Sequence, residues 1–497
     1  MRLLSSTIKF VKIVILLAVI LSVILVYRTI NFVPDHQSID KIPSIRIDYQ
    51  QAAERLAASI RFKTISQQDP KDQQTQPFLD FHQYLERTFP LVHSNLELEK
   101  VNQLSLLYRW RGKNKNQTEN LNQKPVLYMA HFDVVPVDPS TLSDWRFPPF
   151  DGVVDEEIIW GRGVLDDKGA VIAIMESAEY LLSQGFQPNR DIYFAFGHDE
   201  EIGGEQGAKK IATHLQSKNI KFEYVLDEGG FVTKDMMPGT DFPVVLIGVA
   251  EKGYVSVNLS VQSEGGHSSV PPKSTSIGIL SKAIVQLENT PFKPRLVSAT
   301  ENMLETIGRY QPFTKRIVFA NLWLFKPFVI EQLTETKLTN ATIRTTMAAT
   351  VFNAGDKENA LPINASAVVN LRLLPGDKVE DVKPHIVAAI DDPRVKVEVL
   401  RGGEATSISS IDSAFYKQLV RSIEQVSPEQ NMVIVPNLLV GGTDSKHFMA
   451  LADNVYRFNG VKITPESFSG FHGTNEYLPI EEYQRAINLY YQLLKLN

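Results

Sequence analysis

The most constraining feature of the sequence is a series of short apolar segments that alternate with helical ones. Residues 126–130 and 192–197 are apolar runs typical of buried strands, and residues 168–182 between them carry apolar side chains at helical spacing. This alternation predicts an α/β fold, with a mainly parallel sheet covered by helices on both faces. In such sheets, ligands bind beyond the carboxyl ends of the strands.

Histidine and carboxylate side chains gather at these strand ends and in the loop between the strands. They are His131 and Asp133, the pair Asp166 and Asp167, the run Asp199, Glu200 and Glu201, and Asp227 and Glu228 after a strand at 224–226. The chain has no cysteine. Disulfides and thiolate ligands are therefore excluded, and any metal must be held by His, Asp and Glu.

The candidate metal ligands are four of these residues, His131, Asp166, Glu201 and Asp227, together with His472 near the C-terminus. Oxygen and nitrogen donors without sulfur suit zinc, manganese or cobalt. One carboxylate shared between two ions would hold them about 3.5–4 Å apart. Open coordination positions would then mark a catalytic site and not a structural one.

Two further residues have roles beside these ligands. Glu200 precedes Glu201, and adjacent side chains in a strand-to-loop turn point in different directions, so Glu200 can face the attacking water as a general base. Asp133 lies two residues after His131 and can accept the imidazole N–H, which would orient that ring.

The 497-residue chain is too long for one ordinary core, so we expect at least two domains. The first pattern stops at Gly253 and resumes after Gly402. We predict a discontinuous catalytic domain (45–252 and 403–497) with a ferredoxin-like α+β domain (253–402) inserted into it. The expected elements of the inserted domain are strands 254–262, 365–373 and 395–400 and helices 276–288 and 377–390.

The N-terminus reads as an export signal. Arg2, Lys9 and Lys12 precede an apolar run at 13–27 that only Ser22 interrupts, and no small-residue cleavage site follows it. Residues 8–27 reach the roughly 20 residues that span a membrane. We favour an uncleaved signal-anchor (residues 1–30, then a linker at 31–44) over a cleaved signal peptide or a buried helix. The positive flank then places the remaining chain outside the cytoplasm, in a periplasmic, extracellular or lumenal compartment.

The net charge is −6 and no long basic run occurs, so nucleic acid is not an expected partner. Within residues 290–340 lies an apolar cluster that includes Phe319, Trp323 and Phe328. This segment could line a pocket for a long acyl chain, rest on the membrane, or be ordinary domain core or a dimer interface.

An ordered series of motifs resembles the dizinc aminoacylase/carboxypeptidase/dipeptidase family of metallopeptidases. The resemblance is closest to the branch of vacuolar Gly-X carboxypeptidases and secreted N-fatty-acyl-amino-acid hydrolases/synthases, and it extends from about residue 45 to the C-terminus. The motifs are HFDVVP, GRGVLDDKG, GHDEE, VLDEGG, GGHSS, NLRLLPG, GGTDS and FHGTNE.

The resemblance implies two Zn²⁺ ions per subunit, for which Mn²⁺ or Co²⁺ can substitute. It assigns His131 and Asp227 to one ion, Glu201 and His472 to the other, and Asp166 to both. It also implies a cis peptide between Asp166 and Asp167, with Glu200 as base and Asp133 as the residue that orients His131. The adjacent Glu228 is an alternative to Asp227, which we favour because it ends the strand.

For the substrate, the resemblance implies that Arg372 and Asn340 clamp a carboxylate and that His267 stabilises the oxyanion. The loop 441–445, with Gly441 and Thr443, would line the pocket. The inserted domain would act as a lid and could form a homodimer.

The expected activity is hydrolysis of an N-acyl amino acid or short peptide with a free carboxylate, with reverse condensation also accessible. A dipeptidase or a short-chain N-acetyl amino acid deacylase is the alternative within this chemistry. A non-catalytic binding protein of the same fold is the alternative outside it.

Overall fold

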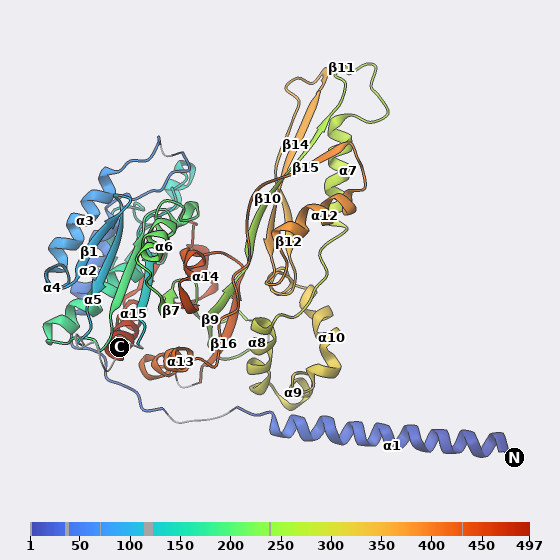
Figure 1. Cartoon of the computed structure of the whole chain (residues 1–497), viewed down its shortest axis with the longest axis horizontal. Coiled ribbons are helices and arrows are strands. Elements are labelled where there is room, and N and C mark those ends of the chain that lie inside the picture. The colour runs from blue at the N-terminus through green and yellow to red at the C-terminus, as the bar shows by residue number, and fades with distance from the viewer. Residues whose placement is uncertain (1, 35–38, 70, 114–122, 238–239, 430) are drawn as a thin grey trace. The chain divides into compact units, whose positions relative to one another are not determined.

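The computed structural model describes the whole chain except residues 1, 35–38, 70, 114–122, 238–239 and 430 (Figure 1). The chain divides into two compact units. We call residues 39–252 and 406–497 the large unit, and residues 1–38 and 253–405 the small unit. The polar, Asn-rich stretch at 112–124 predicts an exposed loop, and most of it lies outside the described residues.

The large unit is built on a ten-stranded sheet whose central strands β6, β3, β7 and β17 pair in parallel. This confirms the predicted mainly parallel sheet. In sheet order, the strands are β1 (Glu97–Val101), β2 (Ser105–Trp110), β6 (Ile192–Gly197), β3 (Val126–His131), β7 (Phe222–Asp227), β17 (Ala452–Arg457), β9 (Val244–Glu251), β8 (Val232–Thr233) and β18 (Lys462–Ile463), with β16 (Val433–Leu439) beside β9.

Helices cover both faces of this sheet, as the alternating side chains of β3 show. Leu127 and Met129 pack in one cluster with Ile211 and other residues of α6, whereas Tyr128 contacts Tyr490 of α15 on the opposite face. The helices of the unit are α2 (Tyr49–Ile60), α3 (Gln76–Thr88), α4 (Pro90–Asn95), α5 (Lys168–Ser183), α6 (Ala208–Ser217), α13 (Ala414–Val426), α14 (Pro465–Ser469) and α15 (Ile480–Lys495). A second sheet joins β4 (Val153–Asp155), β5 (Ile158–Trp160) and β19 (Tyr477–Pro479).

Local signals set the helix ends near the predicted positions. The apolar residues at 45–62 recur at helical spacing and predict a helix there, but α2 starts only at Tyr49 because Asp48 caps it, accepting the Gln51 N–H at 3.0 Å. Helix α5 ends before Gly185, whose φ of +68° is the left-handed conformation that favours glycine after a helix.

The small unit contains a four-stranded antiparallel sheet with α7 and α12 on one face. Alternate residues of β10 and β14, including Val257 and Val369, form one core with Leu280 of α7 and Ile386 of α12. The elements are β12 (Thr346–Ala354), β14 (Asn364–Leu373), β10 (Gly253–Gln262), β15 (Val395–Gly403), α7 (Ser276–Glu288), α12 (Val379–Ile390), and the short pair β11 (Gly266–His267) and β13 (Ala360–Leu361).

Residues 290–340, which we expect as an insertion within the ferredoxin-like domain, are mostly helical, and the N-terminal helix belongs to the same unit. The insertion has a core of its own that includes Leu304, Leu322 and Val329. Residues Ser6–Asn31 of the N-terminal helix are long and apolar enough to cross a membrane. These helices are α1 (Arg2–Asn31), α8 (Ser298–Arg309), α9 (Phe313–Ala320), α10 (Leu322–Thr334) and α11 (Lys337–Ala341).

Candidate metal centre

The carboxylate of Asp166 lies between two histidines of the large unit. Its Oδ1 is 3.0 Å from His131 Nε2, and its Oδ2 is 3.0 Å from His472 Nε2. His131 ends β3, Asp166 lies two residues before the start of α5, and His472 lies in the loop after α14. Segments far apart in the sequence thus place one carboxylate oxygen against each imidazole.

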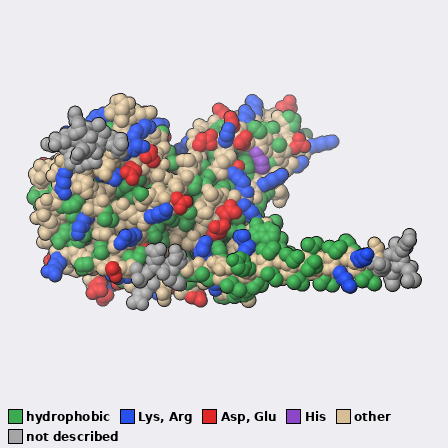
Figure 2. Space-filling model, turned by 60° about the horizontal axis from the view of Figure 1, so that its bottom comes forward, with side chains coloured by type: hydrophobic (Ala, Val, Ile, Leu, Met, Phe, Trp, Pro, Cys, Tyr) green, Lys and Arg blue, Asp and Glu red, His purple; other side chains and the backbone are tan. Residues whose placement is uncertain are grey.

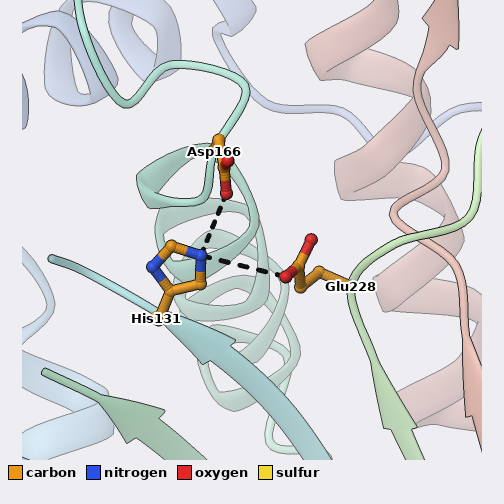
Figure 3. A group of neighbouring side chains, drawn as sticks. All are labelled: His131, Asp166 and Glu228. Carbon is orange, nitrogen blue, oxygen red and sulfur yellow. Dashed lines mark hydrogen bonds and ion pairs between the residues drawn. The ribbon is translucent and has the colours of Figure 1, made fainter. Parts of the chain in front are cut away.

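Two potential metal-binding groups share this carboxylate. His131, Asp166 and Glu228 (Figure 3) offer ligand atoms that all lie within 4.8 Å of one another, and so do Asp166, Glu201 and His472. Each group combines one imidazole with two carboxylates. This is the donor set that suits a divalent ion such as zinc.

The first group contains Glu228, the alternative to the Asp227 that we expect as a ligand. Glu228 Oε1 lies 3.9 Å from His131 Nε2. Asp227, the last residue of β7, turns its Oδ2 to the backbone N–H of Ser445 at 2.8 Å. In this structure Glu228, the first residue after β7, is therefore the carboxylate of the pair that lies nearest the His131 ring in the candidate group.

Asp133 ties His131 to the loop that follows β6. Its buried carboxylate lies 3.4 Å from His131 Nδ1 and accepts the backbone N–H groups of Glu200 and Glu201 at 3.1 and 3.2 Å. Burial alone would raise the pKa of Asp133, but the hydrogen bond from His131 lowers it below its usual value. An ionised Asp133 therefore fixes the ring of His131 and the backbone that carries Glu200.

The protonation states of the two histidines and of Asp166 depend on one another. Although burial alone would raise the pKa of Asp166, its hydrogen bonds from His131 and His472 hold it below the usual range. The hydrogen bonds to Asp166 and Glu201 raise the pKa of His472 to about 10. Without a metal, the carboxylates thus hold protons on the imidazoles, and a bound cation would take the place of those protons.

The remaining carboxylates also fit a cation. Burial, reinforced by neighbouring acidic groups, raises the pKa of Glu228 well above its usual range and raises that of Glu201. Glu201 Oε1 is buried and has no hydrogen-bond partner among the described residues. A divalent ion would supply the missing partner and would stabilise the ionised forms of both side chains.

Sequence reasoning overlooked Glu476, which holds the loop that carries Asp166. Its fully buried carboxylate pairs with Arg162 at 2.5 Å and accepts the N–H groups of Gly163, Leu165 and Asp166 at 3.0, 2.9 and 3.3 Å. The signal was present in the sequence, since Glu476 closes the FHGTNE motif that contains His472.

The loops that carry Asp166 and His472 each contain a residue with a positive φ angle. Gly163 has a φ of +99°, and a Cβ there would lie 2.7 Å from Val134 Cγ1. His472 itself has a φ of +54°, which is unusual for a residue with a side chain and is typical of functional sites. The peptide bond between Asp166 and Asp167 is cis, as the resemblance implied.

The loop at 441–445 is held by a buried ion pair between Glu251 and Arg457. The two side chains meet at 2.5 Å, and Glu251 also accepts the Thr443 N–H at 2.6 Å. The Thr443 hydroxyl lies 2.6 Å from Ser445 Oγ. The buried side chain of Thr443 is thus engaged within the protein, whereas Gly441 is exposed and borders open space.

The other predicted substrate-binding residues belong to the small unit. The guanidinium of Arg372 lies 4.9 Å from the ring centre of Tyr254, and exposed His267 accepts the Ser269 N–H. Asn340 lines a cavity of about 130 Å³, to whose lining Arg344 contributes but Arg372 does not.

Replacing Glu476 tests its role in holding Asp166. We expect Glu476→Ala to lower the free energy of unfolding by about 3–5 kcal/mol, because it leaves a buried guanidinium without its partner. Zinc binding, measured by calorimetry on the folded variant, should weaken as Asp166 loses its support. Glu481→Ala removes an exposed carboxylate nearby in sequence and should change stability by no more than about 0.5 kcal/mol. Equal stability and zinc affinity in the two variants would contradict this role.

Comparison with known proteins agrees with the geometry. The model of peptidase family M20/M25/M40 matches residues 127–496. "Probable carboxypeptidase S-like 2" of Dictyostelium discoideum is 39% identical over 507 aligned residues, covering 99% of this chain and 95% of that protein. The human "N-fatty-acyl-amino acid synthase/hydrolase PM20D1" is 37% identical, covering 93% and 91%.

Among solved structures, an M20 family metallo-carboxypeptidase of Sulfolobus solfataricus has the same fold. The TM-score is 0.62 at 20% sequence identity, and the match covers 90% of this chain and 99% of that one. The sequence relatives and the family model together confirm the resemblance drawn from the motifs. The chain belongs to peptidase family M20/M25/M40 and is an enzyme of its metallopeptidase and amidohydrolase class.

Proposed function

We propose that the protein hydrolyses the amide bond of N-acyl amino acids or short peptides that end in a free carboxylate. The observation that carries this proposal is the Asp166 carboxylate shared between two ligand groups, with Glu200 on the adjacent loop. The similar proteins named as a carboxypeptidase S-like protein and an N-fatty-acyl-amino acid synthase/hydrolase support this substrate class.

In this proposal, His131, Asp166 and Glu228 hold one zinc ion, and Asp166, Glu201 and His472 hold the other. Manganese or cobalt could replace zinc, because the donors are oxygen and nitrogen only. When bound, the two ions would polarise the scissile carbonyl and favour ionisation of water.

Glu200 is the proposed proton carrier. Loss of solvation raises the pKa of its carboxyl well above the usual range, which suits a group that both accepts and returns a proton near neutral pH. It would accept a proton from the attacking water and deliver it to the leaving nitrogen. The products are a carboxylate and an amino acid, and the same groups would serve the reverse condensation.

Arg372 is the proposed partner of the substrate carboxylate, since its planar guanidinium can donate two parallel hydrogen bonds. Its pKa is lowered by burial and by neighbouring Arg401, so an anion at this position would be stabilised by both cations. His267 would donate to the oxyanion, in keeping with the family resemblance. Asn340, which lines a cavity of the same unit, would complete the clamp in keeping with the family resemblance.

The remaining parts of the proposal concern location and assembly. Helix α1 would anchor the enzyme with its catalytic part outside the cytoplasm, because the lysines precede the apolar run. The inserted domain at 253–402 would act as a lid and could join two subunits.

The Glu200→Gln variant tests the proton carrier. We expect turnover to fall by about 10²–10⁴-fold, while zinc content measured by elemental analysis stays unchanged. Glu205→Gln changes an exposed carboxylate of the same segment and should retain normal turnover. Near-normal turnover in Glu200→Gln would show that another group carries the proton.

A matched substrate panel tests the reaction itself. The detergent-solubilised full chain would be offered N-oleoyl-Phe, N-acetyl-Phe, a Gly-Leu dipeptide and N-oleoyl-Phe amide. We expect hydrolysis of acylated substrates with a free carboxylate, loss of that activity on chelation, and recovery with added zinc.

The capped amide should not be cleaved, because it cannot pair with Arg372. Preference for Gly-Leu would favour the dipeptidase alternative, and preference for N-acetyl-Phe would favour the short-chain deacylase. Cleavage that resists chelation, or no cleavage of any substrate, would contradict the proposal.

A further inference from the structure

The apolar α9–α10 segment (residues 313–334) lies beside the end of the candidate membrane helix. Residues Ser6–Asn31 form 26 residues of helix, which is about 39 Å and enough to cross the roughly 30 Å hydrocarbon core. Hydrophobic side chains cover most of the visible face of α1 (Figure 2). If α1 spans a bilayer, whatever packs on its last turns is held close to the membrane surface.

The junction between α9 and α10 packs on those last turns. Arg28 Nε donates to the Ala320 carbonyl at 3.1 Å, and Asn321 Nδ2 donates to the Leu25 carbonyl at 3.3 Å. The same Asn321 amide reaches Thr29 Oγ1 at 3.4 Å, and both Thr29 and Asn321 are fully buried. This contact is therefore a specific, desolvated one and not a chance approach of two helices.

A second contact lies one turn further along the chain. Arg309, at the end of α8, places its guanidinium 4.6 Å from the ring centre of Phe32 and donates to the Val33 carbonyl at 3.3 Å. Helix α8 and the α9–α10 junction thus contact the chain from Leu25 to Val33, where α1 would leave the hydrocarbon core.

The same segment exposes large apolar side chains although it has a core of its own. Leu322 and Val329 are buried in that core, whereas Trp323, Phe328 and Leu324 are 57%, 51% and 39% exposed. Aromatic residues, and tryptophan above all, prefer the membrane–water interface. Exposed apolar side chains that adjoin a membrane helix therefore mark a lipid-facing surface.

We propose that the α9–α10 segment is a second membrane contact, inserted into the leaflet where α1 ends. Trp323, Leu324 and Phe328 would lie about 5–10 Å into the boundary between headgroups and acyl chains. This proposal rests on the proposed anchoring by α1 and not on the proposed reaction. The contact would hold the small unit at the membrane surface.

The absence of cysteine makes the test direct, because one introduced cysteine takes one fluorescent label. Phe328→Cys, Ile15→Cys and Val270→Cys would each be labelled with an environment-sensitive dye in the full chain, reconstituted in phosphatidylcholine vesicles. Ile15 lies within α1, and Val270 is 79% exposed beside β11, at the other end of the small unit from α9 (Figure 1). Vesicles would carry spin labels either at the headgroup or in the middle of the acyl chain.

We expect headgroup spin labels to quench the probe at position 328 more strongly than mid-chain labels do. The probe at position 15 should be quenched more strongly by mid-chain labels, and the probe at position 270 should be quenched by neither. A water-exposed probe at 328 beside a lipid-exposed probe at 15 would overturn the proposal. So would a probe at 328 that is shielded from water but not quenched by either lipid, since a second copy or another protein segment would then cover it.

A water-exposed probe at position 15 would overturn the anchor and this proposal together. Hydrolysis of N-oleoyl-Phe by each labelled protein, measured in parallel, keeps the reaction separate. Loss of activity with lipid contact intact would leave the second membrane contact standing and count only against the proposed function.

Discussion

The two oxygens of one carboxylate, Asp166, face two different histidines at 3.0 Å each, and the site depends on this contact. The contact is possible only if the loop before α5, the end of β3 and the loop after α14 meet at one point. Glu476 fixes the first of these by pairing with Arg162 and accepting three backbone N–H groups. A buried charge that is satisfied so completely costs much less than its isolation in the interior would suggest.

Many carboxylates lie close together in the large unit and repel one another. Some of them are stabilised by a histidine or arginine held beside them. Asp133 remains ionised against His131, and Glu251 is held by Arg457. Among the described residues Glu228 and Glu201 have no arginine or lysine partner; Glu201 lies 3.1 Å from His472 and Glu228 lies 3.9 Å from His131, and burial raises the pKa of each carboxyl. Burial also raises the pKa of Asp167, Glu200 and Asp444 well above the usual range, so the concentration of buried carboxylates extends beyond the groups that would bind divalent ions.

Sequence patterns predicted the sheet and several helices closely, since apolar periodicity depends on local spacing; α7 occupies the predicted residues 276–288. Clustering of acidic groups at strand ends was equally predictable. The choice between Asp227 and Glu228 was not, because it depends on which side chain Ser445 engages across the fold. Glu476 was missed for the same reason, because its role arises from buried contacts between distant segments. Exposure of Trp323 beside α1 likewise follows from tertiary packing alone.

The most direct test of the shared carboxylate is a crystal structure of the zinc-loaded protein with anomalous diffraction at the zinc edge. We predict two anomalous peaks about 3.5–4 Å apart, bridged by Asp166. His131 and Glu228 should complete the protein ligands of one ion, and Glu201 and His472 should complete those of the other. A single ion at full occupancy, Asp227 in place of Glu228, or an Asp166 that binds neither ion would contradict the account.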